Sequence, residues 1–552
     1  MQRSIRISAF LFTALGASAQ FINYRGVVNG ASFTPPGLSG SQIARGSVFS
    51  IFGQGIGPAT LTKVSGFPLL TTLAGVSVQV IQGNTTVNAF PIVVTANQVN
   101  AIMPSNAPLG RVAIQVTYNS APSNTTAATV AANSFGIFAA NSGGFGPGIL
   151  YNFVAQNNQP LNSLVQTAAP GQVITLWGTG LGPVSADNVA PTPGNLATPV
   201  EIFVGGVLAA KQYSGRSPCC AGVDQIVFAV PADAPLGCYV PVQIRTAGTT
   251  LSNAVTMAIQ KGGGPCSDPG NAIAPLFAKG GKVGAAILVS EMFRTDVDTS
   301  QPTDITYDKA MISLRSAPGG ALFFNSVLSA PPLGACTMYS VAGRSLILNM
   351  PALLGGLGSE LDAGPAIAIT GTSQVSLSRN PLSPLYYAVL GTDDPDLGAS
   401  TLVFNSTTPT QISAPGGAGV GAFQVAIPPA AQVNWLNRLQ IETIDRTEPL
   451  TVTWSPTGLQ NTTMAVAGSN YDLATNTTRT FVCTASPAAG SFAVPSYILG
   501  AIPASSNGFG QSYGILALAA GPAQGLTTFH ASGLDAGIAV QISSSVKTVL
   551  FQ

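Results

Sequence analysis

The chain has 552 residues, of which 7% are charged, and its formal net charge is +1. It contains 62 glycines and 41 prolines, and hydrophobic residues make up 46%. This length predicts several domains, and the low charge excludes a charge-rich disordered chain. The near-neutral balance offers no basic surface to nucleic acid or anionic lipid, so we expect neither partner.

The first 19 residues have the features of a secretory signal peptide. Arg3 and Arg6 precede an apolar run over residues 7–15, and an Ala-Ser-Ala cleavage site follows at 17–19. The run is too short for a membrane anchor, and no later stretch indicates a membrane span. We therefore expect an exported mature chain that begins at Gln20 and is secreted or held at the cell envelope.

The next part of the chain contains two copies of one unit. The copies share three segments: GSVFSIFGQGIGP at 46–58 with GQVITLWGTGLGP at 171–183, NQVNAIMP at 97–104 with DQIVFAVP at 224–231, and APLG at both 107–110 and 234–237. Apolar residues alternate with small polar ones, which is typical of strands with one buried face. Strands joined by turns, without helical patterns, predict two antiparallel β-sandwiches over residues 20–141 and 142–262.

Each copy carries alternating glycines where a predicted strand ends: Gly53, Gly55 and Gly57 in the first, and Gly178, Gly180 and Gly182 in the second. Such a run could indicate a phosphate-binding loop, but that loop needs a helix whose N-terminus meets the phosphates. Both runs end on proline, no helical pattern follows, and the P-loop lysine is missing. We interpret the glycines as structural hinges that allow a bulge or a positive φ, and we predict no cofactor site.

These segments carry a family resemblance. A strand ending in G-x-G-x-G, then V-x-V, then Q-I/V before an apolar strand and a proline, resembles the immunoglobulin-like IPT/TIG domains. The segment RSPCCAGVDQI at 216–226, together with Gly237-Cys238, Ser252-Asn253 and CSD at 266–268, is more closely similar to secreted acidobacterial proteins of the Solibacter type. The resemblance covers residues from about 23 to 268. It implies an immunoglobulin-like fold and export, and it implies no activity.

The cysteines are candidates for disulfides: Cys219, Cys220, Cys238, Cys266, Cys336 and Cys483. Export permits disulfides, and the spacings do not resemble zinc sites. The pairing cannot be derived from the sequence alone. We favour Cys238 with Cys219 or Cys220, and Cys336 with Cys483. Because Arg111 aligns with Cys238 in the first copy, a bridge there would be an addition that stiffens the junction with the next domain.

A glycine-rich linker at 262–265 precedes the C-terminal half. Strand-like runs alternate with turns in two blocks, which predict a β-rich domain over 267–430 and a β-sandwich over 431–552. Examples of these runs are residues 285–289, 321–324, 450–454, 491–494 and 539–542. We expect Trp454 in a core rather than on a sugar-binding surface, because its neighbours alternate as in a strand.

The pentapeptide GQSYG at 510–514 matches the nucleophile elbow G-x-S-x-G. A true elbow lies between a parallel strand and a helix, and its histidine follows far along the chain. The single histidine, His530, lies too near, and the flanks are typical of β turns. We interpret Ser512 as a loop residue and predict no catalytic residue, since acid–base catalysis mostly recruits residue types that are scarce here.

Two acidic clusters could offer oxygen ligands to Ca²⁺. One combines Asp296 and Asp298 with Asp304 and Asp308, and the other is DDPD at 393–396. Neither has the order of an EF-hand or belongs to a calcium-binding repeat. We interpret both as solvated loops and predict no metal site.

The sequence thus predicts an exported, non-enzymatic, all-β protein with tandem immunoglobulin-like β-sandwiches followed by further β-sandwich domains. We expect a structural, adhesive or surface-binding role toward an extracellular protein, a polysaccharide or a cell-envelope component. The alternative is a secreted carbohydrate-binding or carbohydrate-active protein with immunoglobulin-like accessory domains. Hydrolysis would need two carboxylates about 5 to 10 Å apart in a groove, and a serine hydrolase would need His530 within reach of Ser512.

Overall fold

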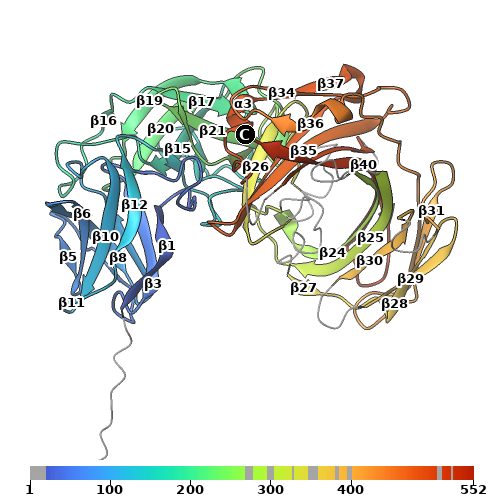
Figure 1. The fold of residues 1–552 in the computed structure, drawn as a ribbon, viewed down its shortest axis with the longest axis horizontal. Coiled ribbons are helices and arrows are strands. Elements are labelled where there is room, and N and C mark those ends of the chain that lie inside the picture. Colours follow the sequence, from blue (N-terminus) through green and yellow to red (C-terminus); the bar gives the residue numbers. More distant parts are fainter. Residues whose placement is uncertain are drawn as a thin grey trace, which may run out of the picture.

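The computed structural model describes residues 20–267, 278–294, 304–325, 329–345, 358–379, 385–394, 401–506, 513–523 and 526–552. The expected signal peptide lies outside these residues. Regular structure within them is almost entirely β-strand. The bounded helical elements are short: η2 (Arg438–Gln440), η3 (Pro487–Ala489) and α3 (Ser496–Leu499). Figure 1 shows repeat 2 lying between repeat 1 and the C-terminal half of the chain.

Repeat 1 is a sandwich of two sheets. The first sheet has the order β1-β3-β9-β8-β4, with β1 (Phe21–Asn29), β3 (Val48–Gln54), β4 (Thr62–Lys63), β8 (Phe90–Val94) and β9 (Gln98–Ile102). The second has the order β2-β12-β10-β6-β5, with β2 (Ile43–Ala44), β5 (Thr72–Leu73), β6 (Val76–Gln82), β10 (Gly110–Tyr118) and β12 (Thr126–Ala131), and with β7 (Thr85–Asn88) and β11 (Ala121–Pro122) beside them.

In repeat 2 the first sheet has the same strand order as in repeat 1, whereas the second sheet has fewer strands. The first sheet of this repeat is β13-β15-β20-β19-β16, with β13 (Gly136–Ile137), β14 (Leu150–Asn152) beside β15, β15 (Val173–Thr179), β16 (Gly194–Asn195), β19 (Ala210–Arg216) and β20 (Asp224–Ala229). Its second sheet contains β17 (Val200–Val204), β18 (Val207–Leu208), β21 (Gly237–Thr246), β22 (Thr250–Leu251) and β23 (Val255–Ile259). Since β13 already belongs to this sheet, the second unit begins before the expected boundary at 141/142.

The repeated segments occupy equivalent places in the two sandwiches. In repeat 1, β3 pairs with β9 and places Ile51 opposite Val99, and in repeat 2, β15 pairs with β20 and places Leu176 opposite Ile226. All four side chains are buried in their cores. Alternation of this kind puts one face of each strand inside the sandwich, where each aliphatic side chain contributes about 1.5–3 kcal/mol.

The C-terminal half is built on an eleven-stranded sheet with the central order β26-β36-β35-β38-β40-β24-β25-β27. Its strands are β24 (Gly281–Arg294), β25 (Asp304–Ala317), β26 (Cys336–Ala342), β27 (Ser359–Glu360), β30 (Tyr386–Thr392), β33 (Thr443–Ile444), β35 (Thr462–Asp472), β36 (Thr477–Ala485), β38 (Gly514–Pro522), β39 (Thr527–Phe529) and β40 (Ala536–Phe551). A four-stranded sheet contains β28 (Ala366–Thr370), β29 (Gln374–Ser378), β31 (Thr410–Ala414) and β32 (Phe423–Ile427), and a two-stranded sheet contains β34 (Leu450–Thr453) and β37 (Ser491–Val494).

This sheet departs from the expected division at 430/431. Strands β24 and β40 pair in parallel from Val283↔Ala536 to Arg294↔Lys547, so the first and last described strands of the half are neighbours. One core joins the large sheet to the four-stranded sheet, and a second joins it to the segment around β34 and α3. The two expected domains therefore share one sheet, while each expected block contributes most of one core.

Residues 321–324 do not form the expected strand. They lie in a turn and irregular backbone, and the ring of Phe324 packs edge-on against Tyr239 of repeat 2, with 5.9 Å between ring centroids. This apolar run serves packing between parts of the molecule rather than a sheet. Periodicity alone does not distinguish these two uses.

Candidate functional site

The glycine runs end strands β3 and β15 as expected. Gly55, Gly180 and Gly182 have φ of 64°, 114° and 129°, a region that side chains rarely adopt. At Gly53 and Gly178 a Cβ atom would collide with the backbone carbonyl of a neighbouring strand. No helix follows either run in the described stretches 58–75 and 183–200.

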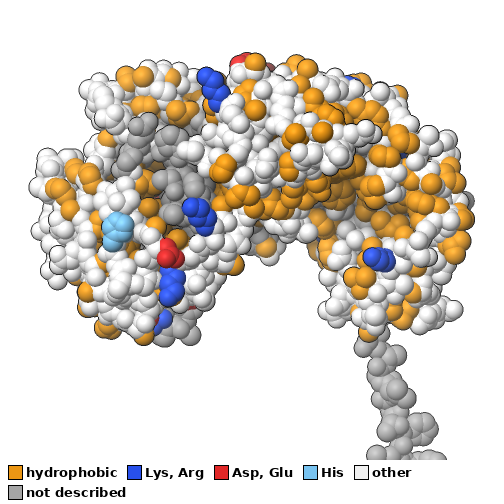
Figure 2. All heavy atoms as spheres, turned by 180° about the vertical axis from the view of Figure 1, so that it is seen from behind, with side chains coloured by type: hydrophobic (Ala, Val, Ile, Leu, Met, Phe, Trp, Pro, Cys, Tyr) orange, Lys and Arg blue, Asp and Glu red, His pale blue; other side chains and the backbone are white. Residues whose placement is uncertain are grey.

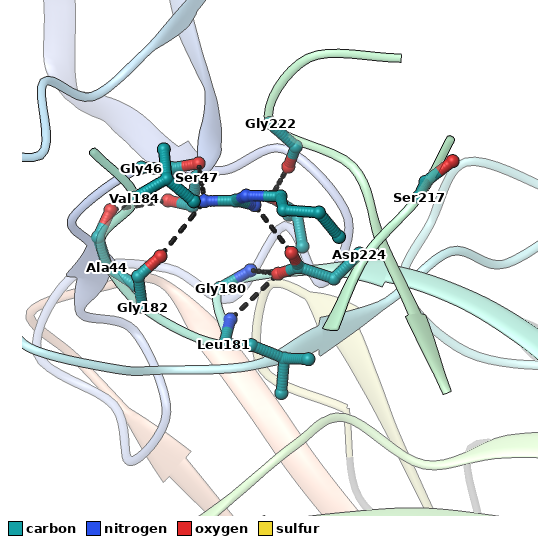
Figure 3. Close-up of polar contacts among 12 residues, drawn as sticks. Ala44, Gly46, Ser47, Gly180, Leu181, Gly182, Val184, Ser217, Gly222 and Asp224 are labelled. Carbon is teal, nitrogen blue, oxygen red and sulfur yellow. Dashed lines mark hydrogen bonds and ion pairs between the residues drawn. The ribbon is translucent and has the colours of Figure 1, made fainter. Parts of the chain in front are cut away.

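In repeat 2 the glycine run binds a carboxylate of the chain itself. The backbone N–H groups of Gly180 and Leu181 donate to one oxygen of Asp224, at 2.7 and 2.8 Å. The other oxygen pairs with the guanidinium of Arg216, which lies opposite Asp224 where β19 meets β20. Figure 3 shows the two N–H groups converging on Asp224. The glycine run thus forms an anion-binding turn, filled by the protein's own side chain.

The same arginine connects repeat 2 to repeat 1. Its Nη2 donates to the carbonyls of Gly46 and Gly182, at 2.8 and 2.9 Å, and Gly46 begins the repeated segment of repeat 1. The side chains of Arg216 and Asp224 are 5% and 0% exposed. Complete burial raises the pKa of Asp224 to about 6, although Arg216 and the two N–H groups favour its charged form.

A second contact fixes the loop between β19 and β20 against repeat 1. The hydroxyl of Thr179 donates to the carbonyl of Gly222. The same hydroxyl accepts from the N–H of Val48 in repeat 1, at 2.8 Å. A Cβ atom on Gly222 would lie 2.9 Å from the Val48 side chain. The backbone of this loop therefore lies directly against the start of β3.

A cleft of about 540 Å³ lies beside this junction. Its described lining combines Gly46, Arg216, Ala221 and Gly222 with most of the loop over residues 183–196. Asp187 of that loop accepts from the N–H and the hydroxyl of Ser105 in repeat 1, both at 2.7 Å. Gly46 is the lining residue from repeat 1 and the other described ones belong to repeat 2, so the cleft lies at the edge of the junction.

The cleft offers little for catalysis. Asp187 and Arg216 already have partners, the other described lining residues are uncharged, and none of the described ones is aromatic. Proton transfer needs a titratable group that can reach the substrate, and sugar recognition commonly uses an aromatic face.

The disulfides differ in part from expectation. Cys336–Cys483 is confirmed, and it joins facing residues of β26 and β36. The expected pairing of Cys238 with Cys219 or Cys220 is wrong: Cys238 pairs with Cys266, and the two adjacent cysteines pair with each other. The Cys238–Cys266 bridge lies in a small core with Phe323 and Phe324 of the C-terminal half.

Other candidate residues do not assemble a site. Ser512 lies outside the described residues, and His530 is exposed. Trp454 is 1% exposed and its indole N–H donates to the Pro487 carbonyl, so the expected core position is confirmed.

The acidic candidates Asp304, Asp308 and Asp393 have partners within the fold. Asp296, Asp298 and Asp396 lie outside the described residues. Asp304 pairs with Arg294 and Arg438. Asp308 accepts from the N–H of Phe404, and Asp393 from the N–H of Thr306. Within the described ranges, no three His, Cys, Asp or Glu side chains group as metal ligands would.

The ion pair at the junction was not predicted from the sequence. Asp224 occupies the position that Asn97 has in repeat 1. There Ile56, aligned with Leu181, donates its N–H to the carbonyl of Ala96. The sequence offered one signal for this ion pair. Only the second copy has a charged residue at this position, and it lies eight positions after Arg216.

The comparisons with known proteins concern the fold. No protein-family model matches the sequence, and no curated protein matches it. A tandem of titin immunoglobulin domains is 11% identical over 40% of this chain and 90% of that one, with a TM-score of 0.12. Domains 5–6 of the S-layer protein SbsC are 10% identical over 44% and 98%, with a TM-score of 0.15.

A third solved structure is the SGBP-B protein of the Bacteroides ovatus mixed-linkage glucan utilization locus, in complex with a mixed-linkage heptasaccharide. It is 11% identical over 79% of this chain and 80% of that one, with a TM-score of 0.13. These matches indicate distant similarity alone, and the all-β fold of this chain is shown by its own sheets. No helix in the described residues has the length and apolar character of a membrane span.

Proposed function

We propose that the protein is an exported, non-enzymatic β protein that holds immunoglobulin-like modules in one fixed arrangement and presents them to an extracellular or cell-envelope partner. The observation that carries this proposal is the set of direct contacts between all three parts of the molecule. A flexible string of modules would lack them, because interfaces between domains are often small and allow motion.

The contacts are varied in chemistry. Repeat 1 meets repeat 2 through Arg216, which pairs with Asp224 inside repeat 2 and donates to the Gly46 carbonyl of repeat 1. Repeat 2 meets the C-terminal half through the stacked rings of Phe203 and Tyr497, with centroids 5.6 Å apart, and Arg245 lies over the same Phe203 ring. Repeat 1 meets the C-terminal half through Arg479, which donates to the carbonyl of Ser39.

The surface supports binding more than catalysis. Figure 2 shows few charged side chains on the face in view: some gather in a column on the left lobe, and the others lie among neutral and hydrophobic atoms. The cleft between the repeats lacks paired, unengaged carboxylates among its described lining residues. No specific observation favours the carbohydrate-active alternative.

Export and the finer family assignment belong to the same proposal. Three disulfides, with all six cysteines paired, fit an oxidising compartment. The repeated glycine segments support membership of the IPT/TIG type of immunoglobulin-like domain.

The test is a binding assay with the mature chain from Gln20 onward. Immobilised protein is exposed to isolated cell-envelope fractions, to purified polysaccharides and to secreted proteins. We expect retention of an envelope or extracellular component, with glycans recovered at their original length. Shortened glycans in the supernatant would contradict a non-enzymatic role, and retention of soluble polysaccharide alone would favour the carbohydrate-binding alternative.

A further inference from the structure

The junction of the three parts contains an arginine whose hydrogen-bond partners are all neutral. Arg479 of β36 donates from Nη1 to the carbonyls of Ser39 and Ala501, at 3.2 and 2.9 Å. From Nη2 it donates to the hydroxyl of Thr34 at 3.4 Å. These partners come from repeat 1 and from the segment after α3, so the guanidinium lies where separate parts of the chain meet.

No carboxylate compensates this charge. The ion pairs found among the described residues do not include Arg479. Burial lowers the pKa of Arg479 to about 10, and no acidic side chain acts against that shift. The side chain is half-buried, and removing part of a charge from water is unfavourable unless nearby groups compensate it. Arg216, the buried arginine between repeats 1 and 2, has Asp224 for this purpose.

Arg479 lines a cavity of about 60 Å³. Repeat 1 contributes residues 32–35 and Ser39, repeat 2 contributes 143–145 and 251–254, and the C-terminal half contributes 338–340 and Ala501. A water molecule needs at least about 10–15 Å³ of such space, so the cavity has room for a small inorganic anion. Its lining combines apolar side chains with hydroxyls, backbone groups and one guanidinium.

Hydroxyl donors accompany the guanidinium. The oxygen of Thr34 accepts from Arg479 and the oxygen of Ser32 accepts from the N–H of Thr34, which leaves each hydroxyl proton to be donated. Ser340 faces Arg479 in the register of β26 and β36 and lines the same cavity. A cation surrounded by hydroxyl donors is the chemistry that binds a halide or a compact oxyanion.

We propose that this junction cavity is a binding site for a small inorganic anion, held against the guanidinium of Arg479 with hydroxyl donors from Thr34 and Ser32. The anion supplies a counter-charge and connects repeat 1 with the C-terminal half. The proposal concerns a site distinct from the cleft and does not depend on the identity of the extracellular partner.

The first test is thermal unfolding of the mature chain in sodium bromide and in sodium gluconate at equal ionic strength. Bromide fits the cavity, whereas gluconate is too large. We expect bromide to raise the Tm by about 2–5 °C relative to gluconate. The same rise is expected for Arg111→Met, a surface control, and for Arg479→Lys, which keeps the charge. In Arg479→Met the Tm should be the same in bromide and in gluconate. An equal rise in the Tm of that variant would overturn the proposal.

The second test needs no variant and covers the case in which Arg479→Met fails to fold. Crystals of the wild-type chain are soaked in bromide and the anomalous signal is mapped. We expect a peak within hydrogen-bond distance of the Arg479 guanidinium. A map without a peak in this cavity would overturn the proposal even if bromide raises the Tm.

Discussion

At the scale of single residues, the side chain of Arg216 connects repeat 2 to repeat 1. It pairs with Asp224 within repeat 2 and donates to Gly46 of repeat 1. Breaking a buried pair by removing one partner leaves a charge without compensation. A surface pair has water as an alternative partner and contributes little.

We predict that Arg216→Met lowers the free energy of unfolding by about 3–5 kcal/mol. The matched control is Arg379→Met, because Arg379 forms an ion pair with Asp362 in which the side chains are 40% and 32% exposed. Its loss should cost about 1 kcal/mol or less from the pair itself. Urea denaturation at pH 7 gives both values, and equal midpoints for the two variants would contradict the prediction.

The pH dependence of stability should carry a signature of Asp224. Its pKa is about 6 in the folded chain, raised from 3.8 by burial, so between these values the folded state holds a proton that the unfolded state has lost. This contribution to stability is complete below about pH 3.8 and disappears as the pH rises through 6.

We therefore expect the unfolding free energy of the wild type to fall, relative to that of Asp224→Asn, by up to about 3 kcal/mol between pH 4 and pH 7. Denaturation curves of both proteins at a series of pH values measure this difference. A difference that stays constant, or that grows in favour of the wild type as the pH rises, would show that the prediction is wrong.

At the scale of elements, the glycine run shows what the sequence could and could not reveal. The repeat, the strand before it and the absence of a following helix were all readable from spacing and periodicity. The use of Gly180 as a turn that binds Asp224 was not, because that contact joins positions 44 residues apart. The partner of Cys238 was missed for a similar reason. The spacing of cysteines along the sequence does not encode which segments of the chain lie together in the fold.

Alanine substitutions should separate two costs of replacing a glycine: backbone strain at a positive φ, and collision of the new Cβ atom with a neighbouring group. Gly180 and Gly171 both have positive φ, at 114° and 81°. A Cβ atom at Gly180 would collide with the carbonyl of Ser134, whereas Gly171 has open space around it. Gly171→Ala should cost about 1–2 kcal/mol from backbone conformation alone. Gly180→Ala should cost clearly more in the same thermal unfolding assay, and a similar cost for both would contradict this geometry.

The disulfide pattern is open to direct measurement. Non-reducing peptide mapping should recover Cys238 with Cys266 and Cys336 with Cys483, and a single peptide should contain the bonded pair Cys219–Cys220. Replacing Cys336 and Cys483 by alanine should cost about 2–5 kcal/mol. Recovery of Cys238 linked to either of the adjacent cysteines would contradict this connectivity.

At the scale of the whole molecule, the structure has fewer independent parts than the sequence suggested. Local periodicity predicted the strands over 450–454, 491–494 and 539–542, and these form β34, β37 and part of β40. It could not predict that β40 pairs with β24, because no local pattern encodes a partner at the other end of the half. The contacts of Phe203 with Tyr497 escaped prediction for the same reason.

The fixed arrangement of modules can be tested in solution. Tyr497→Ala removes the ring that stacks on Phe203, so small-angle X-ray scattering should show a larger radius of gyration than for the wild type. Tyr24→Ala is the control, because that ring is 82% exposed. If Tyr497→Ala scatters like the wild type, this stack does not hold the modules together.

The parallel pairing of β24 with β40 also orders events during synthesis. Each repeat completes its sheets from its own contiguous residues, so it can fold as soon as it has emerged. The C-terminal half has to hold β24 and β25 without their central neighbour until the final strand arrives. Until β40 has paired with β24, the unpaired strand edges can pair with wrong partners. We therefore expect the yield of folded protein to depend on the pairing of β40.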